Sequence, residues 1–208
     1  MTMLSAAAGT ATWSLLEYLI HNGLGHKFAK NRNLFAREHV RHHATTSYFA
    51  ANWKKVATAT VAGALIAPIA CAVAGKRRGL SFTAGFLGAY GAYEGLHRRV
   101  HTHGPRGPYS RWARKHHFYH HFHNPSANHG VTSPIWDHVF GTYEEPGRIR
   151  VPEKHAMPWL VDDDPLEGRT VHERFRDDYE VLQKKRKHDA VPPPSGVRDQ
   201  APAESSAA

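Results

Sequence analysis

The sequence predicts an all-α fold: an integral membrane helical bundle in which a transmembrane hairpin carries a histidine-rich helical cap on the cytoplasmic side. Three observations predict it. Two long segments lack charged residues and are separated by a short basic stretch, as in a helical hairpin that crosses a bilayer. Histidines recur at helical spacing on both sides of this hairpin. Lysine and arginine are concentrated on the histidine side.

The N-terminal segment Leu4–Ile20 is a helix of borderline length for a membrane span, and a buried core helix is the competing interpretation. Its last turn places Glu17 and His21 on one face. His26 follows after two glycines. Because residues five apart do not align in a regular α-helix, we expect the helix to end near these glycines, so that His26 turns back towards His21.

The segment Val56–Ala74 has no charged residue and is the best transmembrane candidate, since Pro68 within it is tolerated in a membrane helix. Residues 80–93 are also uncharged, and we expect this second helix to continue to His101. Residues 22–55 hold seven lysines and arginines and residues 97–117 hold six, against three in the turn at 76–78. This imbalance places the histidine side in the cytoplasm.

Histidine boxes flank the hairpin. Two triads have the spacing i, i+3, i+4, which is typical of one helical face, so each is expected to point three imidazoles at one place. Two further pairs have the spacing His-x4-His, for His21 and His26, and His-x3-His, for His97 and His101. Neutral imidazole is the commonest protein metal ligand. The candidate ligands are His21, His26, His39, His42, His43, His97, His101, His117, His120 and His121.

Ten ligands are too many for one ion, because a structural zinc site takes four. They suit two ions, with about five ligands each. Iron is the redox-capable metal for such imidazole sites, and zinc, which also accepts imidazole, can replace it on purification. Glu17, Glu94 and Asp137 are expected to offset part of the metal charge and to orient the imidazoles.

The remaining histidines carry weaker expectations. Five lie close to the boxes, and for them a functional and a purely structural role are about equally expected. Three others, further along the chain, are interpreted as ordinary surface or core residues. In chain order these eight are His103, His116, His123, His129, His138, His155, His172 and His188.

The composition divides the chain into a membrane-embedded domain at 1–144 and a polar C-terminal extension at 145–208, with disorder expected from about 190. Leu166–His188 is interpreted as a charged surface helix. The net charge of +9 is compatible with an anionic membrane surface, and no nucleic-acid-binding motif occurs. Cys71 is the one cysteine, so neither an internal disulfide nor a thiolate zinc cluster is expected.

The ordered set of boxes, together with the segment from Gly130 to Thr142 (Gly-Val-Thr-Ser-Pro-Ile-Trp-Asp-His-Val-Phe-Gly-Thr), resembles the fatty acid hydroxylase/sterol desaturase superfamily. The resemblance covers roughly Glu17 to Tyr143 and is closest to the fatty acid 2-hydroxylase branch. It implies a membrane-embedded, non-haem di-iron oxygenase that hydroxylates a lipid, with a fatty acyl chain as the expected substrate. The ten histidines match the ligands of the family one by one, with His117 opening the last box.

The resemblance also implies partners and alternatives. Electrons are expected from a separate donor, a b-type cytochrome or a ferredoxin with its reductase, because the sequence contains no cytochrome domain. The run from Gly95 to Arg99 is similar to bacterial carotenoid hydroxylases, so a carotenoid or sterol hydroxylase or desaturase is the first alternative. A non-enzymatic membrane metal-binding protein is the second. The absence of His-Glu-x-x-His argues against a zinc protease.

Overall fold

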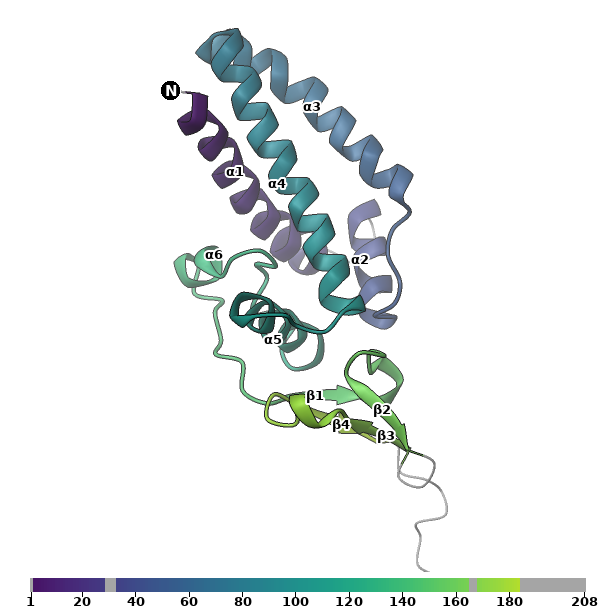
Figure 1. Cartoon of the computed structure of the whole chain (residues 1–208). Coiled ribbons are helices and arrows are strands. Elements are labelled where there is room, and N and C mark those ends of the chain that lie inside the picture. The colour runs from purple at the N-terminus through teal and green to yellow at the C-terminus, as the bar shows by residue number, and fades with distance from the viewer. Residues whose placement is uncertain (1, 29–32, 165–167, 184–208) are drawn as a thin grey trace, which may run out of the picture.

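The computed structural model describes residues 2–28, 33–164 and 168–183, and within these ranges the chain is mostly helical. Three long helices stand side by side at one end of the molecule, and shorter helices and strands form a cap at the other end (Figure 1). The long helices are α1 (Thr2–Leu19), α3 (Asn52–Ala74) and α4 (Lys76–Thr102). Helix α4 lies between the other two.

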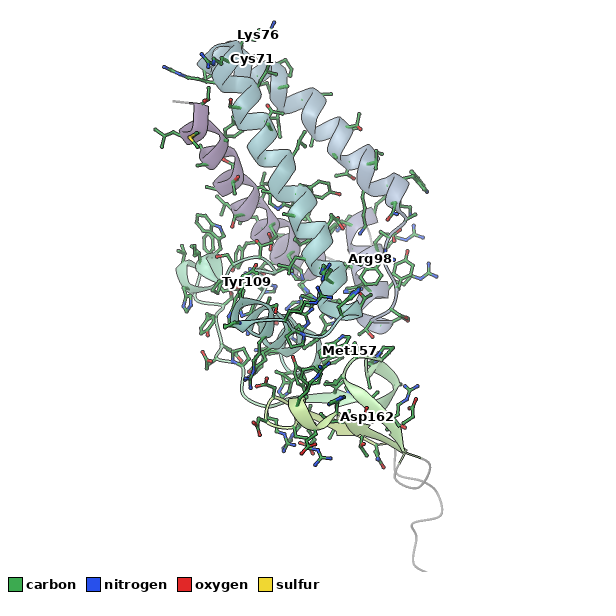
Figure 2. All side chains as sticks on the ribbon, in the orientation of Figure 1. Cys71, Lys76, Arg98, Tyr109, Met157 and Asp162 are labelled. Atoms are coloured by element: carbon green, nitrogen blue, oxygen red, sulfur yellow. The ribbon has the colours of Figure 1, made fainter. Side chains whose placement is uncertain are left out.

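Helices α3 and α4 run antiparallel and are joined at Gly75, whose φ of 80° is the left-handed conformation that glycine adopts without strain. The basic residues from Lys76 to Arg78 therefore form the first turn of α4 rather than a separate loop, and they lie at the end of the molecule opposite the cap (Figure 2). The predicted continuation of the second hairpin helix to His101 is confirmed, since α4 ends at Thr102.

Of the described helices, α3 is the one that is long and apolar enough to cross a membrane, and its most apolar stretch is not buried. Its exposed apolar side chains include Val61, Leu65 and Ile69. The second predicted span lies within α4, which does not meet the same test of length and composition. The transmembrane character of the pair as a hairpin therefore stays a prediction.

Between α1 and the cap, the chain forms a π-helix from Ile20 to Lys27. The expectation that the first helix ends near the two glycines is wrong, because α1 continues directly into this π-helix. In a π-helix the hydrogen bonds join residues five apart, as between the amide of Phe28 and the carbonyl of Gly23 at 2.7 Å. Such winding brings residues five apart towards one face, which is how His21 and His26 come to lie together.

The two triads lie on α2 (Leu34–Ala44) and α5 (Pro108–Phe122). The side chain of Asn33 caps α2 by accepting a hydrogen bond from the amide of Ala36 at 2.6 Å. Helix α5 begins with a proline at its first position, where the missing N–H has no cost. The short helix α6 (Ile135–Val139) follows, and it holds Asp137.

The prediction of an all-α fold is wrong in the C-terminal extension. Strand β1 (Ile149–Pro152) pairs in parallel with β4 (Tyr179–Leu182), and β2 (Val161–Asp164) pairs antiparallel with β3 (Gly168–Val171). Short 3₁₀ turns occur at Glu153–His155 and Glu173–Phe175. The predicted surface helix over 166–188 is therefore absent from residues 168–183. The predicted disorder from about 190 lies outside the described residues.

The extension packs on α5 rather than hanging free. Ile149, Val151 and Tyr179 are fully buried together with Phe118 of α5. Strands of four residues are too short to be stable alone, so burial against this helix stabilises them. The extension also reaches α4, because the indole N–H of Trp159 donates to the carbonyl of His101 at 3.1 Å.

Helix α4 is fixed at both of its ends. Near α1 the two backbones nearly touch, and a methyl group added at Gly85 would lie 2.1 Å from the carbonyl oxygen of Ala6. At the cap, the guanidinium of Arg114 is buried. Its Nη2 donates to the carbonyl of Arg99 at 3.0 Å, and its Nε donates to the carbonyl of His103 at 2.7 Å. A cation satisfies the last carbonyls of a helix and opposes its dipole.

We predict that Gly85→Ala lowers the stability of the helical bundle, because the added methyl meets backbone that cannot move aside, and overpacking of this kind costs about 1–3 kcal/mol. Gly88→Ala is the control, since nothing lies within 4 Å of its Cβ position. Alanine favours a helix over glycine by about 0.5–1 kcal/mol, so the control should melt at the same or a higher temperature. Thermal unfolding in detergent, followed by circular dichroism, measures both; equal melting temperatures would contradict the close contact.

Candidate metal centre

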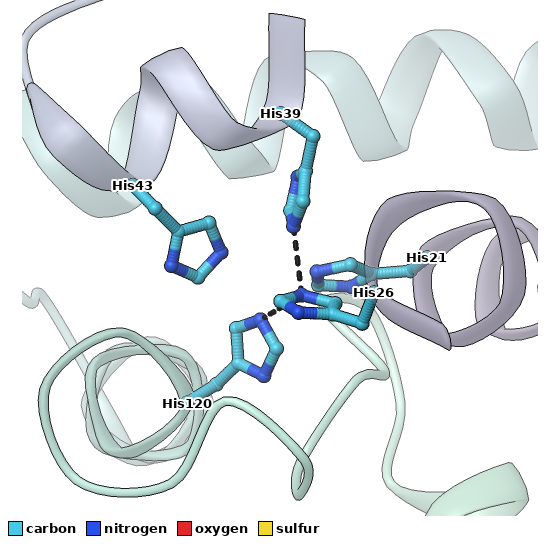
Figure 3. Close-up of side chains that lie close together, drawn as sticks. All are labelled: His21, His26, His39, His43 and His120. Carbon is cyan, nitrogen blue, oxygen red and sulfur yellow. Dashed lines mark hydrogen bonds between the residues drawn. The ribbon is translucent and has the colours of Figure 1, made fainter. Parts of the chain in front are cut away.

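The ten boxed histidines form two groups, and within each group one ligand atom per residue lies within 4.8 Å of every other. The first cluster consists of His21, His26, His39, His43 and His120. The π-helix, α2 and α5 supply these rings, which converge on one point (Figure 3). The second cluster consists of His42, His97, His101, His117 and His121, from α2, α4 and α5.

Each triad is divided between the two clusters, so the expectation that each points three imidazoles at one place is wrong. On α2, His39 and His43 enter the first cluster while His42 enters the second. On α5 the assignment is reversed, since His120 enters the first cluster while His117 and His121 enter the second. Adjacent residues on an α-helix differ in direction by about 100°, so neighbouring histidines face different sides. The clusters are adjacent, and the rings of His43 and His121 stack at 4.1 Å.

The ring nitrogens crowd together, and several Nε2 atoms face two other Nε2 atoms, whereas a neutral ring nitrogen can make only one hydrogen bond. Nε2 of His42 lies 3.0 Å from Nε2 of His97 and 3.1 Å from Nε2 of His101. In the first cluster, Nε2 of His26 lies 2.8 Å from that of His39 and 3.0 Å from that of His120. Metal–nitrogen bonds of about 2.1 Å put neighbouring ligands about 3 Å apart. The observed separations therefore fit nitrogen lone pairs that surround a cation.

Hydrogen bonds to backbone carbonyls set which nitrogen carries the proton. Nδ1 of His42 donates to the carbonyl of Tyr48 at 2.8 Å, and Nδ1 of His120 donates to that of Ala127 at 2.7 Å. Nδ1 of His21 donates to the carbonyl of His129. Since a neutral imidazole has one N–H, Nε2 of each ring is left with a free lone pair. This arrangement orients a ring as a metal ligand.

Burial keeps the rings uncharged. Loss of solvation lowers the pKa of His26 and of His42 to about 4, and that of His43 to about 3. These rings are therefore neutral at pH 7, as metal ligands must be. Several ligand-bearing nitrogens are buried without a hydrogen-bond partner, among them Nε2 of His21, His43 and His121. A cation in each cluster would satisfy them.

Asp137 and Glu17 contact the loop that borders the first cluster. Asp137 is fully buried and accepts hydrogen bonds from the amides of His129 and Gly130, both at 2.8 Å, and from the hydroxyl of Thr142. Glu17 accepts from the amides of Val131 and Thr132 and from the hydroxyl of Thr132. These carboxylates thus hold the backbone whose carbonyls orient His21 and His120. Glu94 instead forms an ion pair with Lys55.

Two buried histidines were not among the predicted ligands. His116 is paired with Asp137 at 3.2 Å between Nε2 and Oδ2. His129 is also fully buried, and it lies beside the first cluster. Both lie outside the regular boxes, so helical spacing could not distinguish them from surface histidines. The Asn-His-Gly sequence that contains His129 offers no signal of its own.

A cavity of about 80 Å³ opens onto both clusters. Its wall includes His39 of the first cluster and His42 and His97 of the second, and Phe49 and Tyr93 supply aromatic surface. The pair of Lys55 and Glu94 also lines it, so the cavity reaches the first turns of α3. A small molecule or the end of a chain could enter here from the side of the apolar helix.

Comparisons with known proteins agree with this geometry. A family model described as fatty acid hydroxylase matches residues 6–142. A ceramide very long chain fatty acid hydroxylase of Saccharomyces cerevisiae is 32% identical over 144 residues, which are 66% of this chain and 37% of that protein. A dihydroceramide fatty acyl 2-hydroxylase of Arabidopsis thaliana is 29% identical over 142 residues, which are 67% of this chain and 60% of that protein.

The solved structure of full-length scs7p, in which only the hydroxylase domain is visible, has a TM-score of 0.53 and 26% sequence identity. The match covers 71% of this chain and 59% of that one. The chain therefore spans less than two thirds of the length of these relatives. The matched residues contain all ten boxed histidines.

We predict that Asp137→Asn weakens metal binding by about 10–100-fold, as replacing the hydrogen-bond partners of metal ligands commonly does. The reason is that an amide cannot accept from all the donors that face this carboxylate. Asp163→Asn is the control, because Asp163 is exposed and pairs with Arg169 at 3.2 Å, away from the clusters. Competition with a chelator, read by metal content, measures the change; affinity equal to that of the control would contradict the positioning role.

Proposed function

Because this chain belongs to the fatty acid hydroxylase family, we propose that it is a membrane-bound, non-haem di-iron oxygenase. It hydroxylates a fatty acyl chain of a lipid, with dioxygen as oxidant and electrons from a separate donor. The observation that carries the proposal is the pair of adjacent five-histidine clusters. A storage protein needs only affinity, whereas two neighbouring clusters on one cavity would allow a substrate to lie beside two bound metals.

The protein's own part is to hold two cations in a neutral, nitrogen-rich pocket. Five imidazoles per cluster supply lone pairs, and the carbonyls of Tyr48, Ala127 and His129 fix ring orientation. Burial excludes water from most of these nitrogens. Iron bound there would supply the redox chemistry that dioxygen activation and C–H hydroxylation require.

A lipid substrate is supported by three features. The relatives named above act on fatty acyl chains, in ceramide or dihydroceramide by their names. The cavity beside the clusters adjoins the start of α3, the apolar helix. Its aromatic wall, with Phe49 and Tyr93, suits a hydrocarbon chain, while Lys55 and Glu94 suit the polar end of an amphiphile.

The membrane arrangement follows from the same helices. In the proposal, α3 and the uncharged part of α4 lie in the bilayer, and the clusters lie at its cytoplasmic surface. The abundance of basic residues around the cap supports this orientation by the positive-inside rule. A cytoplasmic cap is also where a b-type cytochrome, or a ferredoxin with its reductase, could deliver electrons.

We predict that His120→Ala and His42→Ala each abolish hydroxylation, because each removes a ligand from a different cluster. The test uses a strain of the native host from which the gene has been deleted, and restores it with either the wild-type or a variant gene. The lipid mass profiles of the restored strains are then compared. The native host is used because it supplies the electron donor. His103→Ala is the control, since its exposed ring contacts only the neighbouring Thr102 among described hydrogen bonds.

A lipid that gains one oxygen atom only with the wild type and the control establishes the hydroxylase and identifies its substrate. Loss of two hydrogens instead would indicate a desaturase. Equal profiles for wild type and His120→Ala, with both proteins present in the membrane, would refute the enzyme and favour metal storage or sensing.

We predict that Lys76→Cys, in a Cys71→Ser background, reacts with a membrane-impermeant maleimide added outside intact cells. Arg106→Cys in the same background should react only after the membrane is opened. Lys76 lies at the hairpin tip (Figure 2), and Arg106 is exposed in the loop between α4 and α5, so in the proposal the two residues lie on opposite membrane faces. The reverse labelling pattern would refute the cytoplasmic assignment, and labelling of both from outside would refute the crossing.

A further inference from the structure

His129 is a buried histidine beside the first cluster. It is 0% exposed, and neither ring nitrogen makes a hydrogen bond. The carbonyl of Ser126 faces the ring without completing such a bond. A buried polar group is costly to leave unpaired. His116, the other buried histidine outside the boxes, differs because its Nε2 is paired with Asp137.

The ring of His129 borders the first cluster, although it is not among the five whose ligand atoms all lie within 4.8 Å of one another. Its centroid is 5.1 Å from that of His120 and 5.4 Å from those of His21 and His26. Centroid separations within the cluster run from 4.5 Å, for His21 and His120, to 6.3 Å, for His39 and His120, so these three distances to His129 fall within the same range.

The backbone is built to hold the ring in this place. The residue before it, Asn128, has a φ of 56°, a left-handed conformation that is uncommon outside glycine and often marks a functional site. Three hydrogen bonds secure it: its amide donates to Thr142, and its side chain is bonded twice to the backbone of Glu144. His129 itself donates its amide to Asp137 and accepts from Nδ1 of His21 through its carbonyl.

We propose that His129 becomes a sixth nitrogen donor of the first cluster by turning its ring towards a bound cation. This inference rests on the proposed metal centre and deepens it, because it makes the two metal positions unequal. The first position is then filled by six imidazoles, and the second has five. Six is the full number of ligands in an octahedral site, so the open position for a reactant belongs to the second cluster.

The cavity supports this assignment of roles. Two members of the second cluster, His42 and His97, line it, against His39 alone from the first. His129 lies on the side of the first cluster formed by the loop before α6, and it is not part of the cavity wall. A ligand there closes the first position without obstructing access to the second.

The test uses cobalt(II), which accepts imidazole ligands and whose visible absorption reports coordination number. Six-coordinate cobalt absorbs weakly, whereas five-coordinate cobalt absorbs more strongly because its site lacks a centre of symmetry. The metal-free wild-type protein in detergent is titrated with cobalt chloride alone. We expect two equivalents to bind, one with weak and one with strong absorption. Two equivalents of equal intensity would overturn the proposal and leave the two-metal centre intact, whereas a protein that binds no cobalt would refute both.

His129→Phe provides the second measurement, since phenylalanine keeps the ring and removes both nitrogens. We expect it to bind two cobalt ions, both with strong absorption, and to release one of them to a chelator at least about 10-fold faster than the wild type. His138→Phe is the matched control from the same segment, because its exposed ring stacks on Tyr143 at 4.0 Å. A His129→Phe protein with the spectrum and release rates of this control would overturn the proposal; should the variant not fold, the wild-type titration decides.

Discussion

Ten imidazoles can be buried together only if they are uncharged and their inward-facing nitrogens have a shared partner. Each unpaired buried nitrogen costs about 1–3 kcal/mol, and the Nε2 atoms of His21, His43 and His121 are buried without a hydrogen-bond partner. Low pKa values remove the charge but not this cost, as His43 shows: its pKa is lowered to about 3 while its Nε2 has no hydrogen-bond partner. A cation in each cluster would couple metal binding to the stability of the cap.

This constraint explains why the cap is built on α2 and α5. Each helix carries a triad, and each triad gives two rings to one cluster and one ring to the other, in opposite order. The two helices therefore bridge both clusters. The remaining ligands enter from the ends of the long helices, His21 and His26 after α1, and His97 and His101 at the end of α4. The metal centre lies where the π-helix, α2, α4 and α5 converge.

Helical spacing was sufficient to single out most of the histidines that the structure brings together and most of the helices, because long uncharged runs and i, i+4 pairs leave strong periodic signals. It could not divide them between clusters, since that depends on how α2 and α5 face each other. It also missed the π-helix, in which His21 and His26 align through winding that two glycines alone do not specify. The strands of the extension were missed because four-residue strands are stabilised by burial against Phe118 rather than by local pattern.

The two clusters are supported by different parts of the chain, and this difference gives the C-terminal extension a structural role. The first cluster depends on the loop before α6, which Glu17 and Asp137 hold through its amides. The second depends on the last turn of α4, where Arg114 and Trp159 satisfy carbonyls that a helix end leaves free. Trp159 belongs to the extension and binds the carbonyl of His101, a member of that cluster. The polar segment that carries no motif of its own therefore holds the backbone of a residue whose ring, in our proposal, binds the metal beside which the substrate reacts.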